Sequence, residues 1–176
     1  MVQQTRWTER TFDFNFPLGI FPCILERLRG TPVRMEELIR SFPAHILTKR
    51  IENRWSIQEH VGHLFDLDAL HDGRLDDYQA GVKALRAADM TNRKTFEANH
   101  NAKPMQDILK PFRSSRIHFV HRLEALDEEK LSRTAIHPRL QMPMRVVDMA
   151  FFVAEHDDHH LACVSHLAKI FLVGHQ

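Results

Sequence analysis

The chain has 176 residues, a length typical of one domain of roughly 100–200 residues, and its 24 basic and 23 acidic side chains give a formal net charge of +1. This balance excludes a surface built to bind the phosphate backbone of nucleic acid or an anionic membrane, so neither partner is expected. Two cysteines, Cys23 and Cys163, are too few for a disulfide framework, and no apolar leader or run of roughly 18 uncharged apolar residues is seen, so we expect a single cytoplasmic domain over residues 1–176.

The N-terminal part predicts an arm followed by two helices. Residues 1–16 mix polar and aromatic side chains and predict an irregular arm, which could reach across a partner or fold as a flap over the bundle. Apolar residues at helical spacing predict a first helix from about Pro17, with Gly30 as its C-terminal stop. The pair Thr31-Pro32 then predicts the start of a short second helix that ends near Pro43.

A capping signal marks the second major helix. Ser56 is followed three residues later by Glu59, the pattern of a capping box, which predicts a long helix over residues 57–78 that is closed by Gly81. Residues 82–103 contain a polar helix whose few apolar side chains are only weakly gathered on one face. We expect this segment to connect the major helices across one end of the bundle.

Two further helices complete the expected fold. Residues 104–126 and 145–173 each carry apolar side chains at helical spacing, and residues 127–144 between them predict a long crossover loop. No strand pattern competes for any segment. The sequence therefore predicts an all-α four-helix bundle with short additional helices and the irregular N-terminal arm.

Histidines interrupt the apolar run of the last helix. His156 and His160 continue the apolar spacing and lie four residues apart, so their rings project from one face with Cβ atoms about 5–6 Å apart. Burying two imidazoles there without partners would cost on the order of 1–3 kcal/mol each, whereas a shared metal ion satisfies both. The spacing predicts a metal site, and His159 points about 60° away as an alternative ligand.

A site between facing helices needs at least a third ligand. The helix over residues 57–78 offers His60, His63 and His71. Periodicity does not choose between His60 and His63, because the apolar face reaches both, whereas His71 lies about two turns further along. An isolated histidine on an apolar face is most often a hydrogen-bonded core residue, so the third ligand stays open on this evidence.

A family resemblance rests on two short motifs. The block WSIQEHVGHL at residues 55–64 and the downstream block HDDHH at residues 156–160 resemble the DinB-like (DinB/YfiT) superfamily of metal-dependent helical proteins. The resemblance implies an up-down-down-up four-helix bundle. In that family the first ligand stands eight residues after the tryptophan, which falls on His63, and the H-x-x-x-H pair falls on His156 and His160, which leaves His60 as an alternative ligand.

The implied site has three imidazole ligands and an open coordination position, as in catalytic zinc sites. Zinc or nickel is the expected ion, and iron or manganese is compatible with the site. Two reactions follow: hydrolysis by metal-bound water, or transfer of a metal-bound thiolate, which family members that use low-molecular-weight thiols suggest. The alternative is a non-catalytic, stress-related bundle that binds a metal or ligand.

No side chain is assigned as a general base. Glu59, Glu155 and Asp157 lie near the expected ligands in sequence and could orient a histidine through its second ring nitrogen, although Glu59 is equally explained by the capping box. The expected partner is a small-molecule substrate, and the resemblance suggests a low-molecular-weight thiol as one such partner. The resemblance also implies a homodimer.

Overall fold

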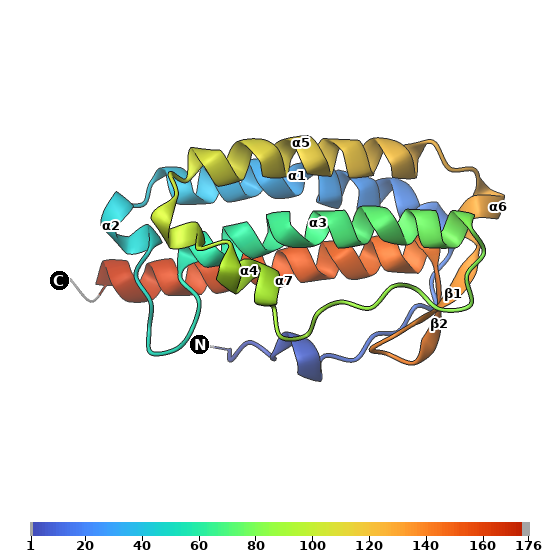
Figure 1. Cartoon of the computed structure of the whole chain (residues 1–176), viewed down its shortest axis with the longest axis horizontal. Coiled ribbons are helices and arrows are strands. Elements are labelled where there is room, and N and C mark those ends of the chain that lie inside the picture. Colours follow the sequence, from blue (N-terminus) through green and yellow to red (C-terminus); the bar gives the residue numbers. More distant parts are fainter. Residues whose placement is uncertain (1, 174–176) are drawn as a thin grey trace.

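Four long helices form the body of the protein in a computed structural model that describes residues 2–173 (Figure 1). They are α1 (Phe21–Arg40), α3 (Ile57–Gln79), α5 (Gln106–Glu124) and α7 (Val146–Val173). Helices α1 and α7 run one way along the bundle and α3 and α5 run the other way, which is the up-down-down-up arrangement. The prediction of an all-α four-helix bundle is confirmed.

Each long helix packs against two others. Helices α1 and α3 each contact both α5 and α7, so α1 and α3 lie diagonally across the bundle. The apolar core has two parts along the axis: the first halves of α1 and α7 meet the second halves of α3 and α5, and the opposite halves build the other part. Within residues 2–173, no helix combines the length and apolar composition needed to cross a membrane.

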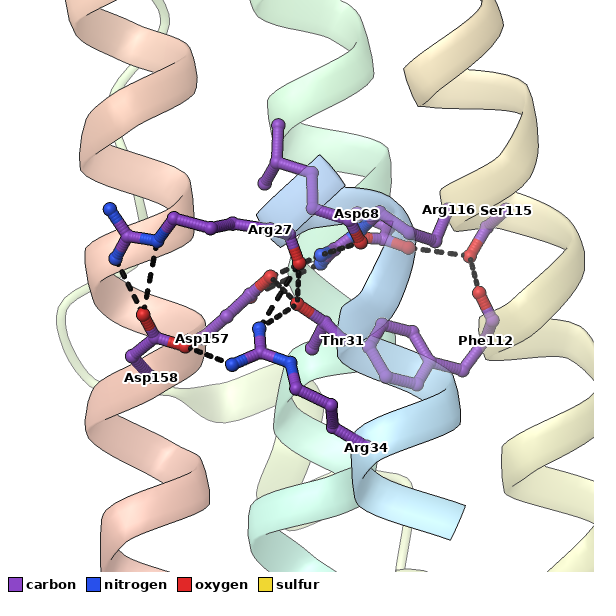
Figure 2. A network of polar contacts seen from close by, with 10 residues as sticks. Arg27, Thr31, Arg34, Asp68, Phe112, Ser115, Arg116, Asp157 and Asp158 are labelled. Atoms are coloured by element: carbon purple, nitrogen blue, oxygen red, sulfur yellow. Dashed lines mark hydrogen bonds and ion pairs between the residues drawn. The ribbon is translucent and has the colours of Figure 1, made fainter. Parts of the chain in front are cut away.

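A buried polar layer separates the two parts of the core, with one residue from each long helix: Thr31, Asp68, Arg116 and Asp157 (Figure 2). The Arg116 guanidinium forms ion pairs with both carboxylates, and its Nη2 lies 2.8 Å from Asp68 Oδ1. Burial alone lowers the pKa of Arg116, but Asp157 and Asp68 outweigh it and raise the pKa above its ordinary value. The layer therefore holds a charged arginine between two carboxylates at the centre of the bundle.

Helix α1 continues through Gly30 and Pro32, where a stop and a second helix were predicted, so that prediction is wrong. Pro32 lacks the N–H group that would bond to the carbonyl of Leu28, and Arg116 Nη1 lies 3.5 Å from that oxygen in its place. Leu28 and Met35 are both fully buried on either side of the proline. One continuous helix therefore buries an apolar face that a break would have exposed in part.

The connection between α3 and α5 runs back along the side of the bundle, so the prediction that it crosses one end is wrong (Figure 1). Because α3 and α5 point in the same direction, the chain must return by the length of a helix between them. The returning segment includes α4 (Arg93–Glu97) and the 3-10 turn η3 (His100–Ala102), and both contact α3. The other short elements are η1 (Trp7–Glu9), η2 (Leu18–Ile20), α2 (Ala44–Leu47) and α6 (Glu128–Leu131).

The segment expected to be a loop before α7 contains a β-hairpin. Strand β1 (Thr134–His137) pairs antiparallel with β2 (Met142–Arg145), opposite to the prediction of no strands. Ile136 pairs with Pro143, and the backbone N–H and C=O groups of Ile136 bond outward to residues 83–85 of the returning segment. The missing N–H of Pro143 therefore costs no ladder bond. Four-residue strands are too short to show a period-two pattern against a helical background.

Candidate metal centre

Three histidines from two helices converge near the middle of the bundle. His63 comes from α3, and His156 and His160 come from successive turns of α7; one ring nitrogen of each lies within 4.8 Å of those of the other two. The Nε2 atoms of His156 and His160 are 3.1 Å apart. Nitrogens about 2.05 Å from a tetrahedral zinc ion lie about 3.3 Å from one another. The spacing therefore fits a single metal ion.

The local sequence explains how the rings meet. Ser56 and Glu59 form the predicted capping box, which fixes where α3 begins and so the level of His63 along the bundle. Because α3 and α7 pack side by side, the His63 ring lies with its centroid 5.3 Å from that of His156 and 4.9 Å from that of His160. The capping box and the helix contact together place ligands that are far apart in sequence.

All three rings are buried and neutral. Burial lowers the pKa of His63 to about 4 and holds the pKa values of His156 and His160 well below their ordinary value, and neighbouring imidazoles add to the effect. Each ring therefore keeps a free lone pair at neutral pH, which is the form that binds a metal.

We expect the metal-free protein to lose stability as the pH falls from 6.5 towards 4. The pKa of His63 is about 4 in the folded protein and 6.5 in the unfolded chain, so in this window the unfolded chain binds the extra proton. The contribution of neutral His63 to the free energy of unfolding is fully present above pH 6.5. By pH 4 the loss of this contribution alone lowers the free energy of unfolding by on the order of 3 kcal/mol.

Urea unfolding of chelator-treated protein at several pH values measures this dependence. Because carboxylates also titrate, the relevant quantity is the difference between the wild type and His63→Gln, in which the ring is absent. Parallel stability curves for the two proteins between pH 7 and pH 4 would contradict a buried neutral His63.

The second ring nitrogen of two of these histidines has a partner. His63 Nδ1 lies 3.1 Å from Thr95 Oγ1, and His160 Nδ1 lies 2.8 Å from His60 Nδ1. These contacts leave Nε2 of both rings for a metal ion and hold the rings in place. His60, considered as an alternative ligand, therefore lies behind His160. Thr95 was not singled out in the sequence, because the short helix α4 has no periodic pattern to mark it as buried.

Replacing His60 by phenylalanine is expected to weaken metal binding about 10–100-fold, because His160 loses the group that orients it while the three ligands remain. Competition with a chromophoric chelator measures the affinity. His159→Phe is the matched control from the same histidine cluster and should bind metal as the wild type does. Wild-type affinity in His60→Phe would show that the contact does not orient His160.

Comparisons with known proteins bear directly on this centre. Residues 27–164, a span that includes all three histidines, match the sequence profile of the DinB superfamily. The chain belongs to the DinB superfamily. The solved structure of YfiT from Bacillus subtilis shares the fold of this DinB protein, with a TM-score of 0.78 and 16% identity over 93% of this chain and 94% of that chain. YfiT is described as a probable metal-dependent hydrolase with an unusual four-helix bundle topology. No curated protein gives a significant sequence match to this chain.

The three histidines of this DinB protein line a cavity of about 410 Å³. The cavity lies between α3, α7, the returning segment, the hairpin and the N-terminal arm. Trp7 of the arm packs edge-on against His156 with ring centroids 4.8 Å apart, and Trp55 lies 4.5 Å from His63. The arm thus packs on its own bundle and forms part of the cavity wall, which is the flap arrangement (Figure 1). The volume is that of a site for a small molecule.

The three carboxylates considered as orienting groups contact arginines instead of imidazoles. The ion pairs are Glu59 with Arg50, Glu155 with Arg10 and Arg27, and Asp157 with Arg116. A guanidinium carries a full charge and several donors, so it attracts a carboxylate more strongly than a neutral ring does. In this DinB protein, His60 and Thr95 occupy the orienting positions for which the carboxylates were candidates.

His159 lines the cavity but does not join the other three histidines. Its Nδ1 lies 2.9 Å from Gln4 Nε2 and its Nε2 lies 3.7 Å from Cys163 Sγ. Both ring nitrogens thus face groups at the edge of the cavity. Their partners explain why the group that could hold a metal contains His63, His156 and His160 and not His159.

Proposed function

We propose that this DinB protein is a metal-dependent hydrolase of a small molecule, with His63, His156 and His160 holding one divalent ion, zinc or nickel before iron or manganese. The observation that carries the proposal is the convergence of three neutral, buried imidazoles on one wall of a cavity of about 410 Å³. A donor set of three imidazoles without a carboxylate suits a catalytic site with an open position. The description of YfiT, a protein of the same fold, points to the same reaction class.

A divalent ion at this position would supply Lewis acidity, which polarises a substrate carbonyl and favours loss of a proton from water or a thiol at neutral pH. The chain itself supplies the rest. Thr95 and His60 hold two of the ligand rings, and the aromatic side chains of Trp7 and Trp55 line the cavity beside the three histidines.

Metal analysis and activity test the proposal in sequence. Protein purified without an affinity tag is analysed for metal, loaded with zinc or nickel, and incubated with a panel of esters and amides, and with electrophiles in the presence of low-molecular-weight thiols. We expect about one ion per chain and hydrolysis of part of the panel. His160→Ala should lose both, whereas His121→Ala, which alters an exposed histidine on α5, should lose neither.

Other results of the metal and activity measurements would indicate a different function or a different site. Turnover that requires a thiol would assign a transferase in place of a hydrolase. Stoichiometric metal without turnover of any substrate would favour the non-catalytic binding protein. Turnover that survives His160→Ala would place the chemistry outside the three histidines.

A further inference from the structure

A second group of polar residues lines the cavity beyond the three histidines. Arg74 and His71 come from α3, and His137 and Arg139 come from the hairpin. All four carry positive charge or hydrogen-bond donors. This composition is unusual for the wall of a cavity, because buried cations normally face an acid.

Arg74 is the central member of this group. Its side chain is only 2% exposed, and its Nε donates to the carbonyl of Arg86 at 3.2 Å. Among residues 2–173, no carboxylate forms an ion pair with it. Burial lowers its pKa to about 10, Tyr78 and Asp77 act in the opposite direction, and Arg139 lowers the pKa further; the Asp77 carboxylate is itself paired with Arg86. A buried guanidinium without a counter-charge is unfavourable unless a bound anion compensates it.

The hairpin contributes further donors without partners. His137 Nδ1 accepts a hydrogen bond from the backbone N–H of Leu140 at 3.2 Å, so the neutral ring carries its proton on Nε2, which is buried and unpaired. Arg139 Nη2 is also buried without a partner. The Arg139 guanidinium carbon lies 5.6 Å from the ring centre of Trp7 and 5.5 Å from that of Phe152, which holds the group over aromatic faces at the cavity wall.

Among the described residues that line the cavity, the one acidic side chain, Asp89, does not neutralise this group. Asp89 is exposed at the rim, and its carboxylate accepts hydrogen bonds from Thr91 and from the backbone N–H of Arg93. Its oxygens are therefore engaged within their own loop. The donors of Arg74, His137 and Arg139 remain for a ligand.

We propose that Arg74, Arg139 and the Nε2–H group of His137 form an anion-binding subsite, and that the substrate is a small molecule carrying a carboxylate or phosphate group. The inference rests on the proposed function only in placing the reacting bond at the three histidines. Along α3, Arg74 lies eleven residues after His63, which places it on the same face of the helix after a rise of about 16 Å. The anionic group therefore lies about three turns of α3 from the metal position.

Titration calorimetry on the chelator-treated full chain tests the subsite without any metal. The probes are phenylbutyrate, its uncharged amide phenylbutyramide, and inorganic phosphate. We expect one of the two anions to bind, and if it is phenylbutyrate, the amide should bind at least about tenfold more weakly. Binding of inorganic phosphate alone would identify a phosphate as the anionic group.

Variants connect the binding to the named residues. Arg74→Met and Arg139→Gln should each weaken anion binding at least about tenfold, whereas Arg113→Gln, which removes an exposed arginine on α5 that pairs with Glu36, should not. Because the subsite charge is uncompensated without ligand, Arg74→Met should leave the Tm unchanged or raise it.

Three results would overturn the proposal: equal binding of the acid and the amide, unchanged anion binding in both variants, or a lowered Tm in Arg74→Met, which would make Arg74 a structural residue. A failure of the metal proposal leaves these measurements intact, because the titrated protein contains no metal. The two proposals can therefore fail separately.

Discussion

Replacement of Arg116 by methionine is expected to lower the free energy of unfolding by about 3–5 kcal/mol. Arg116 is 1% exposed, and its guanidinium joins Asp68 of α3 to Asp157 of α7 between the two parts of the core (Figure 2). Methionine fills most of the vacated volume but leaves two buried carboxylates without a counter-charge. Denaturant unfolding at neutral pH measures the loss.

Arg122→Met is the matched control, because Arg122 lies on the same helix and its ion pairs with Asp72 and Asp76 are partly exposed to solvent. The expected loss there is about 0–1 kcal/mol. Combining Arg116→Met with Asp68→Leu and Asp157→Leu should recover most of the stability, since an apolar layer replaces the whole ionic group. Equal losses in the two single variants would contradict a special role for the buried layer.

The same ionic layer explains why α1 was predicted as two helices. Gly30 and Pro32 are reliable stop and start signals when only neighbouring residues are considered. The carbonyl freed by Pro32 faces Arg116, which is more than 80 residues away in sequence and approaches it only when the bundle has formed. Local signals predicted the start of α3 correctly because its capping box is made by residues three apart.

The returning segment and the hairpin could not be predicted for a related reason. These two segments are held in place by contacts with α3 and with each other, such as the backbone hydrogen bonds between Ile136 and residues 83–85. They have no regular spacing of apolar residues that would mark their structure in the sequence. Thr95, which contacts His63, and Arg139, which lines the cavity, lie on these segments, and Arg74 bonds to the carbonyl of Arg86 in one of them. The sequence therefore predicts the long helices and the histidines on them, but it does not predict which other residues form the walls of the cavity.

The positions of the histidines were likewise predictable where they depend on one helix and unpredictable where they depend on how two helices pack. The spacing of His156 and His160 on one helix was sufficient to predict that their rings lie side by side. The choice between His60 and His63 depends on how α3 meets α7, because both project toward the apolar face. In the structure His63 points its free nitrogen to the common centre, while His60 contacts the far side of the His160 ring.

Adding zinc or nickel to the chelator-treated protein is expected to raise the free energy of unfolding by about 4 kcal/mol when the free metal concentration is 1,000 times the dissociation constant. His63 lies more than 90 residues before His156 and His160 in the sequence, so the unfolded chain does not hold the three ligands together and binds the ion much more weakly. Urea unfolding in metal-buffered solution, with and without excess chelator, measures the gain.

The 13 histidines of the chain make adventitious binding the main competing explanation for any stabilisation by metal. His63→Ala and His156→Ala should therefore abolish the gain, whereas His166→Ala, an exposed position on α7, should keep it. A gain that persists in His63→Ala would place the ion elsewhere. Because His156 Nδ1 is buried without a partner and all three rings are neutral, their removal leaves no unpaired charge behind. The metal-free variants should thus remain folded, and the lost gain can be assigned to the lost ligand.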